Sequence, residues 1–197
     1  MKGSIIYLFF LIFSLSGFSQ EYNFKEKLTR LYFDEPKTFK NGRFYSISKD
    51  GNLNVITIGE KRKGEKQGEW LIFSELWGNP YLKKVENYKN GKLHGYYFET
   101  DYHTFSKEGY YKNGRMHGFW KINHFAISYD KGYYKNGKKH GFWEKDFESY
   151  TEKGYYKNDL REGWWIFEDT DIEVIDENGN KKTPQTKIFY KKGVKIK

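Results

Sequence analysis

Three histidines recur at the same place in successive stretches of the chain, and clustered histidines are common zinc ligands. They are His94, His117 and His140. If each stretch is a β-hairpin, equivalent residues lie two strands apart, about 9.5 Å at the usual strand spacing of about 4.8 Å. Zinc holds its nitrogen ligands at about 2.1 Å, so neighbouring histidines cannot share one ion. The spacing therefore predicts no metal site and favours a role in turn packing.

Residue patterns that carry out catalysis are missing from the sequence. It contains no Ser-His-Asp arrangement, phosphate loop, dinucleotide fingerprint or H-E-x-x-H motif. Carboxylates are plentiful, but they recur at the repeat spacing and form no distinctive pair of the kind that hydrolyses glycans. We therefore expect no enzymatic activity, no catalytic residue and no cofactor.

Two sets of recurring residues have the chemistry of a binding surface. Exposed aromatic side chains mark interaction sites, and regularly spaced cations hold phosphates or sulfates. The alternatives are core packing for any single aromatic residue, and for the cations a solvated edge that suppresses aggregation. The aromatic candidates are Tyr96, Phe119, Phe142 and Trp164. The basic candidates are Lys92, Arg115 and Lys138, within a basic edge that also holds Lys89, Lys112, Lys135, Lys139, Lys157 and Arg161. The opposite edge is expected to carry Asp101, Glu108, Asp130, Glu148 and Glu152.

These residues recur because the chain repeats itself with a period of about 23 residues. Gly109–Trp120 reads GYYKNGRMHGFW, Gly132–Trp143 reads GYYKNGKKHGFW, and Gly154–Trp165 reads GYYKNDLREGWW. An earlier copy, Tyr88–Tyr97, reads YKNGKLHGYY. Self-similarity at a fixed period is typical of repeat arrays.

Each repeat predicts a β-hairpin. An Asn-Gly pair such as Asn136-Gly137 readily adopts the positive φ that a two-residue hairpin turn requires. The short aromatic runs lack helical periodicity, and glycine at two fixed positions marks backbone constraints that a Cβ would obstruct. The expected structural residues are Gly91, Gly95, Gly114, Gly118, Gly137, Gly141, Gly163, Trp70, Trp120, Trp143 and Trp165.

The pattern Y-x-N-G-x-x-x-G-x-W resembles the MORN repeat variant family over roughly residues 38–197, most clearly over 85–168. The resemblance implies an all-β fold, an elongated single-layer antiparallel β-meander in which each repeat contributes two strands. Aromatic residues follow the second glycine directly, as in the variant form, whereas the common MORN form has Gly-x-Gly after the turn. The resemblance also implies an interaction module rather than a catalyst, and some similar proteins are labelled antitoxins of toxin–antitoxin systems.

Alternation along a strand separates the aromatic residues into two rows on opposite faces. One row is Trp70, Tyr97, Trp120, Trp143 and Trp165, continued by Ile72, Ile122 and Phe167. We expect this row to be buried, because its continuation is apolar. The other row, with Tyr96, Phe119, Phe142 and Trp164, is mixed with charges and is expected to be the wet face.

The N-terminus has the features of an export signal. A basic start is followed by the apolar run Ile5–Leu15 and small residues around Ser19, which predicts a signal peptide over residues 1–19. The alternative is an uncleaved anchor; no later segment is apolar enough to cross a membrane. Residues 20–37 are interpreted as an N-terminal cap with a short helix over Phe24–Tyr32, and the array 38–197 carries insertions at 75–81 and 169–186.

Composition limits the choice of partner. Aromatic residues make up 21% of the chain, cysteine is absent and the formal net charge is +9. We expect an exported protein of the periplasm or cell surface that binds another protein. Envelope glycan or anionic lipid, an immunity role against a secreted toxin and a structural role in an assembly are the alternatives. Nucleic acid is not expected, because the central repeats are nearly charge-balanced.

Overall fold

The computed structural model describes residues 42–51, 53–77, 79–125 and 128–196. The predicted signal peptide, the N-terminal cap and the helix predicted within it lie outside the described residues. Within the described part of the chain every regular element is a β-strand, so the predicted all-β class is confirmed. No helix there is long and apolar enough to span a bilayer.

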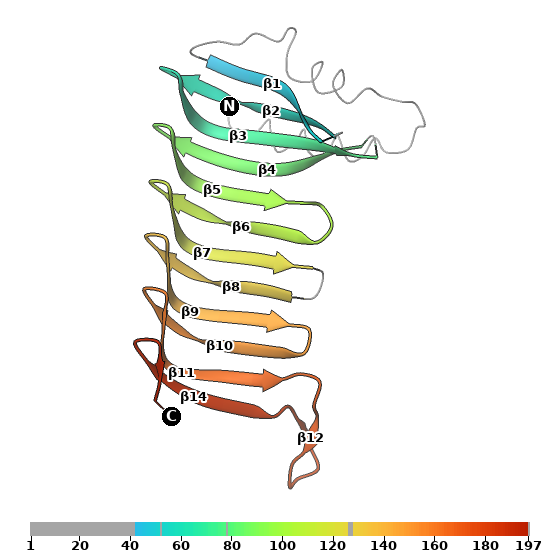
Figure 1. The fold of residues 1–197 in the computed structure, drawn as a ribbon, viewed down its shortest axis with the longest axis vertical. Helices are drawn as coiled ribbons and strands as arrows, with labels where there is room; N and C mark the ends of the chain where they lie inside the picture. The colour runs from blue at the N-terminus through green and yellow to red at the C-terminus, as the bar shows by residue number, and fades with distance from the viewer. Residues whose placement is uncertain (1–41, 52, 78, 126–127, 197) are drawn as a thin grey trace.

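Thirteen strands form one open antiparallel sheet in chain order (Figure 1). Each strand pairs with its neighbours in the sequence, except that β11 pairs with β14 across the insertion that holds β12 and β13. The strands lie side by side in chain order along the long axis of the molecule, which confirms the elongated single-layer meander. They are β1 (Gly42–Asp50), β2 (Leu53–Arg62), β3 (Glu65–Leu76), β4 (Asn79–Lys89), β5 (Lys92–Thr100), β6 (Phe105–Lys112), β7 (Arg115–His124), β8 (Ser128–Lys135), β9 (Lys138–Phe147), β10 (Tyr150–Lys157), β11 (Leu160–Asp169), β14 (Gln185–Lys191) and β15 (Val194–Lys195).

Tight turns line one long edge of the sheet, which we call the turn edge. Both central residues of each turn have positive φ, as in the type I′ turns that match the twist of paired strands. Each turn after the first is tied to the preceding hairpin by a backbone hydrogen bond, for example from the N–H of Gly137 to the carbonyl of Met116 (2.8 Å). The turns are Lys63-Gly64, Asn90-Gly91, Asn113-Gly114, Asn136-Gly137, Asn158-Asp159 and Lys192-Gly193.

The second glycine of each repeat lies at a β-bulge. In the β8–β9 pair Gly132 faces Trp143, whereas the next residue, Tyr133, faces His140. Gly141 and Phe142 therefore form the bulge, and Gly141 has a φ of 76°. Gly95, Gly118 and Gly163 have positive φ at the same position, so all seven predicted structural glycines adopt backbone conformations that suit glycine.

The opposite long edge, which we call the loop edge, carries the connections between hairpins. The predicted insertion at 75–81 forms no separate loop, because its residues extend β3 and β4, which have 12 and 11 residues. The insertion at 169–186 holds a small separate hairpin of β12 (Val174–Ile175) and β13 (Lys181–Lys182). The insertions therefore change the length of this edge without breaking the meander.

The N-terminal strands bury apolar residues that the sequence analysis did not single out. Ile56, Leu71, Phe73 and Val85 form a buried cluster on β2, β3 and β4, and Phe98 of β5 packs against it. Strand pairing places these residues on the face opposite the tryptophans. Both faces of the sheet are thus partly buried in this region.

Candidate functional site

The tryptophan row forms a buried seam along one face of the sheet, which we call the Trp face. Trp70, Trp120, Trp143 and Trp165 are all 0% exposed, as the sequence predicts. Tyrosine rings alternate with them: Trp143 makes edge-to-face contacts with Tyr134 (5.0 Å) and Tyr156 (6.1 Å). Edge-to-face packing suits the aromatic quadrupole, so each ring helps to hold the next repeat in place.

A glycine on the preceding strand provides the seat for each tryptophan. Gly109 faces Trp120, and Gly132 faces Trp143. A Cβ on either glycine would lie closer than 3.0 Å to indole carbons, and the same holds for Gly59 under Trp70 and Gly154 under Trp165. For Trp120, Trp143 and Trp165 the carbonyl of the residue after the seat accepts the indole hydrogen bond, as from Nε1 of Trp143 to Tyr133 (2.9 Å). Nε1 of Trp70 is buried and has no hydrogen-bond partner in the described structure. Because glycine has no Cβ, the indole can pack closely against the strand and its N–H can reach a backbone carbonyl.

Cations cover several of these rings, which corrects part of the predicted basic edge. Lys139 Nζ lies 4.2 Å from the ring centroid of Trp143, and the Arg161 guanidinium lies 4.3 Å from that of Trp165. Lys66 covers Trp70 in the same way at 4.5 Å. Lys139 and Arg161 are therefore partly buried on the Trp face, where cation–π contact stabilises the seam, rather than free on the turn edge.

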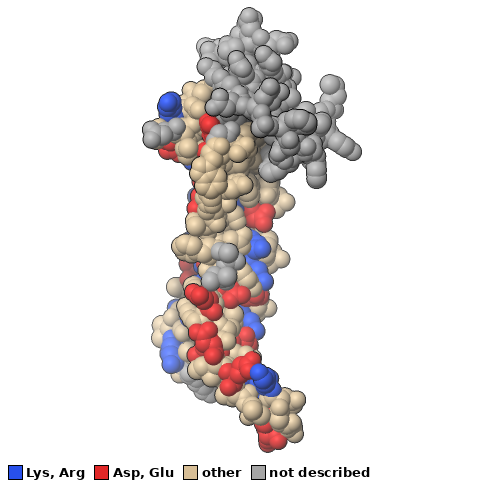
Figure 2. All heavy atoms as spheres, turned by 90° about the vertical axis from the view of Figure 1, so that its right-hand side faces the viewer, with Lys and Arg blue, Asp and Glu red and all other residues tan. Residues whose placement is uncertain are grey.

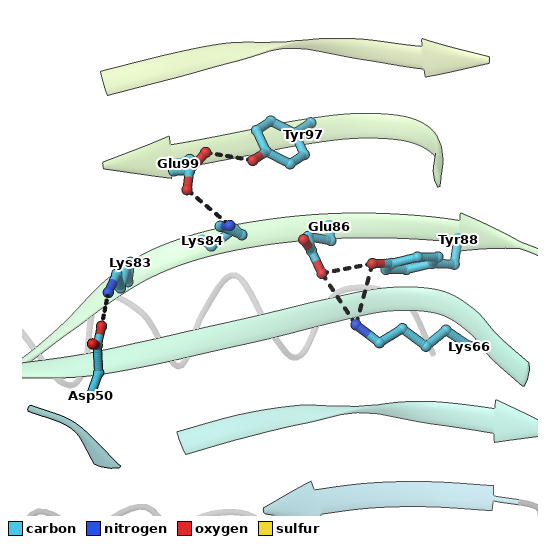
Figure 3. A network of polar contacts seen from close by, with 8 residues as sticks. All are labelled: Asp50, Lys66, Lys83, Lys84, Glu86, Tyr88, Tyr97 and Glu99. Atoms are coloured by element: carbon cyan, nitrogen blue, oxygen red, sulfur yellow. Dashed lines mark hydrogen bonds and ion pairs between the residues drawn. The ribbon is translucent and has the colours of Figure 1, made fainter. Parts of the chain in front are cut away.

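The seam is interrupted at β4 and β5, where Glu86 and Tyr97 replace the usual glycine and tryptophan. A polar network fills the space (Figure 3). Lys66 Nζ lies 3.4 Å from Glu86 Oε2, which also accepts a 2.9 Å hydrogen bond from the Tyr88 hydroxyl. Tyr97 donates to Glu99 (2.6 Å). A tyrosine ring, which is smaller than an indole, thus faces a glutamate, which is larger than the usual glycine.

We expect Tyr97→Trp to destabilise the protein, because an indole at this position would collide with the Glu86 side chain. Glu86→Gly in the same chain should relieve the collision by restoring a glycine seat. Coupling between the two changes should be favourable by about 1–3 kcal/mol in a double-mutant cycle. Urea unfolding of the four proteins measures it, and strictly additive costs would contradict the size match.

Beside the seam, the Trp face carries several ion pairs. Lys84 pairs with Glu99 (2.8 Å), and Glu152 lies between Lys145 (2.9 Å) and Arg161 (2.6 Å). This corrects the predicted acidic edge, because Glu152 is buried within the sheet. Asp130 also lies on the Trp face, because the strand register places it opposite Ile122. Glu108 lies on the other face, where it accepts a hydrogen bond from the Tyr96 hydroxyl. Asp101 and Glu148 do lie at the loop edge.

Alkaline pH should weaken the fold through its tyrosines. Burial raises the pKa of Tyr134 to about 12, and burial together with Glu108 raises the pKa of Tyr96 to about 12. In the unfolded chain tyrosine ionises near pH 10. Since the folded pKa is raised, this stabilisation is complete below about pH 10 and is lost as the pH rises to about 12. Urea midpoints measured across that window should fall, and Tyr134→Phe should reduce the fall. A midpoint that stays constant would contradict the raised pKa of these two tyrosines.

The opposite face, which we call the open face, carries an aromatic stripe from β5 to β14. Cross-strand pairs of rings pack edge to face, with 5.2–5.8 Å between ring centroids and 65–72° between ring planes. All except Phe189 are 37–58% exposed. The pairs are Tyr96 with Tyr110, Phe119 with Tyr133, Phe142 with Tyr155, and Trp164 with Phe189. The four predicted aromatic candidates are thus brought together on one face. The sequence analysis missed their cross-strand partners, three of which are the first tyrosine of a Tyr-Tyr pair.

The turn edge carries exposed cations that make no salt bridge with any described residue. The predicted candidates Lys92, Arg115 and Lys138 are among them, one in each of three successive turns. Because the turns are tied together by hydrogen bonds, these cations form a row at the two-strand period. The row is Lys89, Lys92, Lys112, Arg115, Lys135, Lys138 and Lys157.

The recurring histidines lie beside the turns. The backbone N–H of Asn113, in the next turn, donates to Nδ1 of His94 (3.4 Å), which agrees with the predicted packing role. Nδ1 of His117 and of His140 is buried and has no hydrogen-bond partner in the described structure. Among the described residues no group of three or more side chains could hold a metal ion.

Neither a protein-family model nor any curated protein matches this chain.

Proposed function

We propose that the chain is a non-catalytic, exported repeat scaffold that binds another protein at the cell envelope through the aromatic stripe of its open face. The observation that carries this proposal is the contrast between the two aromatic rows. The row on the Trp face is fully buried, whereas the stripe exposes seven large rings in one continuous line. Aromatic residues are enriched in protein interfaces and dominate their binding energy.

The rigidity of the sheet supports a role in binding. Each ring of the stripe packs edge to face against a ring on the paired strand, so little side-chain freedom is lost when a binding partner covers it. The signal peptide expected over residues 1–19 supports the envelope as the place of action. The MORN-like repeat pattern supports an interaction module rather than an enzyme.

A second candidate is favoured by the turn edge. Its row of cations without salt bridges is suited to an envelope glycan or lipid that carries repeated negative charge. Contacts of this kind weaken strongly as salt rises, whereas contacts to the aromatic stripe do not. Salt dependence therefore separates the two candidates.

Affinity capture from envelope extract tests the proposal. The purified protein should retain one partner protein in both about 0.01 M and about 1 M salt, where the Debye length is about 30 Å and about 3 Å. The double variant Phe119→Ser/Phe142→Ser should lose that partner. Trp77→Ser, which removes an exposed ring from the loop edge, is the matched control and should keep it.

Three results would count against the scaffold. Equal capture by the stripe variant and the control would remove the stripe as the binding site. Capture that is abolished in 1 M salt and by Lys92→Ala/Arg115→Ala/Lys138→Ala would instead favour the anionic ligand. Recovery of glycan or lipid alone would do the same.

A further inference from the structure

Exposed apolar residues lie at or beside each connection along the loop edge. They include Trp77, which is 82% exposed, Tyr102 and Phe125. These three adopt positive φ of 48°, 77° and 59°, a region that bulky residues rarely enter. The row consists of Leu53, Trp77, Tyr102, Phe125 and Tyr150, and the connection between β11 and β14 adds Ile172, Val174 and Ile175.

The loop that carries Tyr102 is held in shape from within. Asp101 Oδ1 accepts the backbone N–H groups of His103 (3.0 Å), Thr104 (2.8 Å) and Phe105 (2.7 Å). A hydrogen bond from the Thr104 hydroxyl, together with these backbone hydrogen bonds, keeps the pKa of Asp101 well below its usual range, so the carboxylate stays charged. Neighbouring loops also touch, since Trp77 contacts His103 at 5.8 Å and Tyr81 contacts Tyr102 at 5.1 Å. The exposed rings are therefore held in an ordered row despite their unfavourable backbone conformations.

No cation of the described structure lies over this row of rings. The contrast with the Trp face is clear, because Lys66, Lys139 and Arg161 each cover an indole there. The loop edge instead carries carboxylates that make no salt bridge with described residues. They are Asp101, Glu148, Asp169, Asp171 and Glu177. Figure 2 shows this edge face on, with acidic side chains gathered over its lower half.

The two long edges thus have complementary chemistry and the same period. The turn edge offers cations on extended side chains, and the loop edge offers aromatic rings flanked by carboxylates. Every hairpin contributes one turn and one loop, so both rows repeat every two strands, about 9.5 Å. A cation row and an aromatic row with the same spacing can match repeat by repeat, and carboxylates add negative charge at the β5–β6, β9–β10 and β11–β14 connections.

We propose that the protein associates side by side with a second copy of itself, the turn edge of one copy lying against the loop edge of the next. Lys92, Arg115 and Lys138 then approach loop-edge rings such as Tyr102 and Phe125, and pair with carboxylates such as Glu148. The contact goes beyond the proposed function, because it leaves the open face free. It joins two different surfaces, so it does not close and the assembly grows sideways as a ribbon.

Charge complementarity favours a second copy over other occupants of the loop edge. A bilayer with anionic headgroups would be repelled by the carboxylates. A second copy supplies cations at the required period without any further component. The protein also already uses the same cation–π and ion-pair contacts within each chain.

Sedimentation velocity of the purified protein tests the proposal. At about 0.01 M salt the average mass should rise with protein concentration, and at about 1 M salt the protein should be monomeric. A turn-edge variant, Lys92→Glu/Arg115→Glu/Lys138→Glu, should have an association constant lower by a factor of about ten or more. A loop-edge variant, Glu148→Lys/Asp171→Lys/Glu177→Lys, should do the same.

Mixing the two variants gives the sharpest result. The turn-edge variant keeps an unchanged loop edge, and the loop-edge variant keeps an unchanged turn edge. The two variants should therefore associate with each other when mixed, although neither protein does so alone. A wild-type protein that stays monomeric at low salt, or a mixture that fails to associate, overturns the proposal. The stripe variant Phe119→Ser/Phe142→Ser should still associate; loss of association in that variant alone would place the contact on the open face and overturn the edge model. Partner capture is a separate readout, so failure here leaves the proposed function standing.

Discussion

Trp143→Ala should lower the free energy of unfolding by about 3–5 kcal/mol, the usual cost of removing a buried tryptophan. The indole is fully buried, packs against Tyr134 and Tyr156, and donates a 2.9 Å hydrogen bond to the Tyr133 carbonyl. Its loss leaves a cavity and an uncovered Lys139. Urea unfolding followed by circular dichroism measures the change.

The neighbouring residue provides the control. Phe142 has a similar size but lies on the open face, where it is 40% exposed and contacts mainly Tyr155. Phe142→Ala should therefore lower the free energy of unfolding by only about 0.5–1.5 kcal/mol. Equal costs at positions 142 and 143 would contradict the assignment of one buried and one exposed row.

Gly132→Ala should be nearly as damaging, although it adds only one methyl group. The new Cβ would lie closer than 3.0 Å to the Trp143 ring, and Trp120 flanks the same glycine on the other side. Either the indole or the strand has to move, so we expect a cost of about 3 kcal/mol. The same unfolding experiment measures it.

Gly114→Ala separates this collision from backbone strain. Gly114 lies in a turn with φ of 77°, and a Cβ there would meet nothing within 4 Å. Its cost should be only that of placing alanine in the left-handed region, about 1–2 kcal/mol. A smaller ring should also suppress the collision, so Gly132→Ala combined with Trp143→Tyr should cost less than the sum of the single changes. A larger effect at Gly114 than at Gly132 would count against the glycine seat.

The hairpin and the two faces could be predicted from the sequence because they depend on local chemistry. Asn136-Gly137 fixes a two-residue turn, and strict alternation after Gly141 places Phe142 and Trp143 on opposite faces. Repetition then extends this local result to every hairpin. The burial of the Trp row follows for the same reason.

Contacts that depend on the bulge could not be predicted from alternation alone. The register shift at Gly141 brings Lys139 opposite Tyr134, so its ammonium group covers Trp143 instead of reaching solvent. The contacts and backbone conformations of residues that depart from the repeat could not be predicted either. Only the strand register reveals that Glu86 occupies the position of a seat glycine. The positive φ of Trp77 and Tyr102 belongs to connections whose sequences do not repeat the Asn-Gly turn.

The stripe on the open face is tested most directly by hydroxyl-radical footprinting of the protein with its captured partner. The account predicts that the partner protects Tyr110, Phe119, Tyr133, Phe142 and Tyr155 from oxidation, while Trp77, Tyr102 and Phe125 on the loop edge remain as reactive as in the free protein. Unchanged reactivity along the stripe, with protection confined to either edge of the sheet, would contradict it.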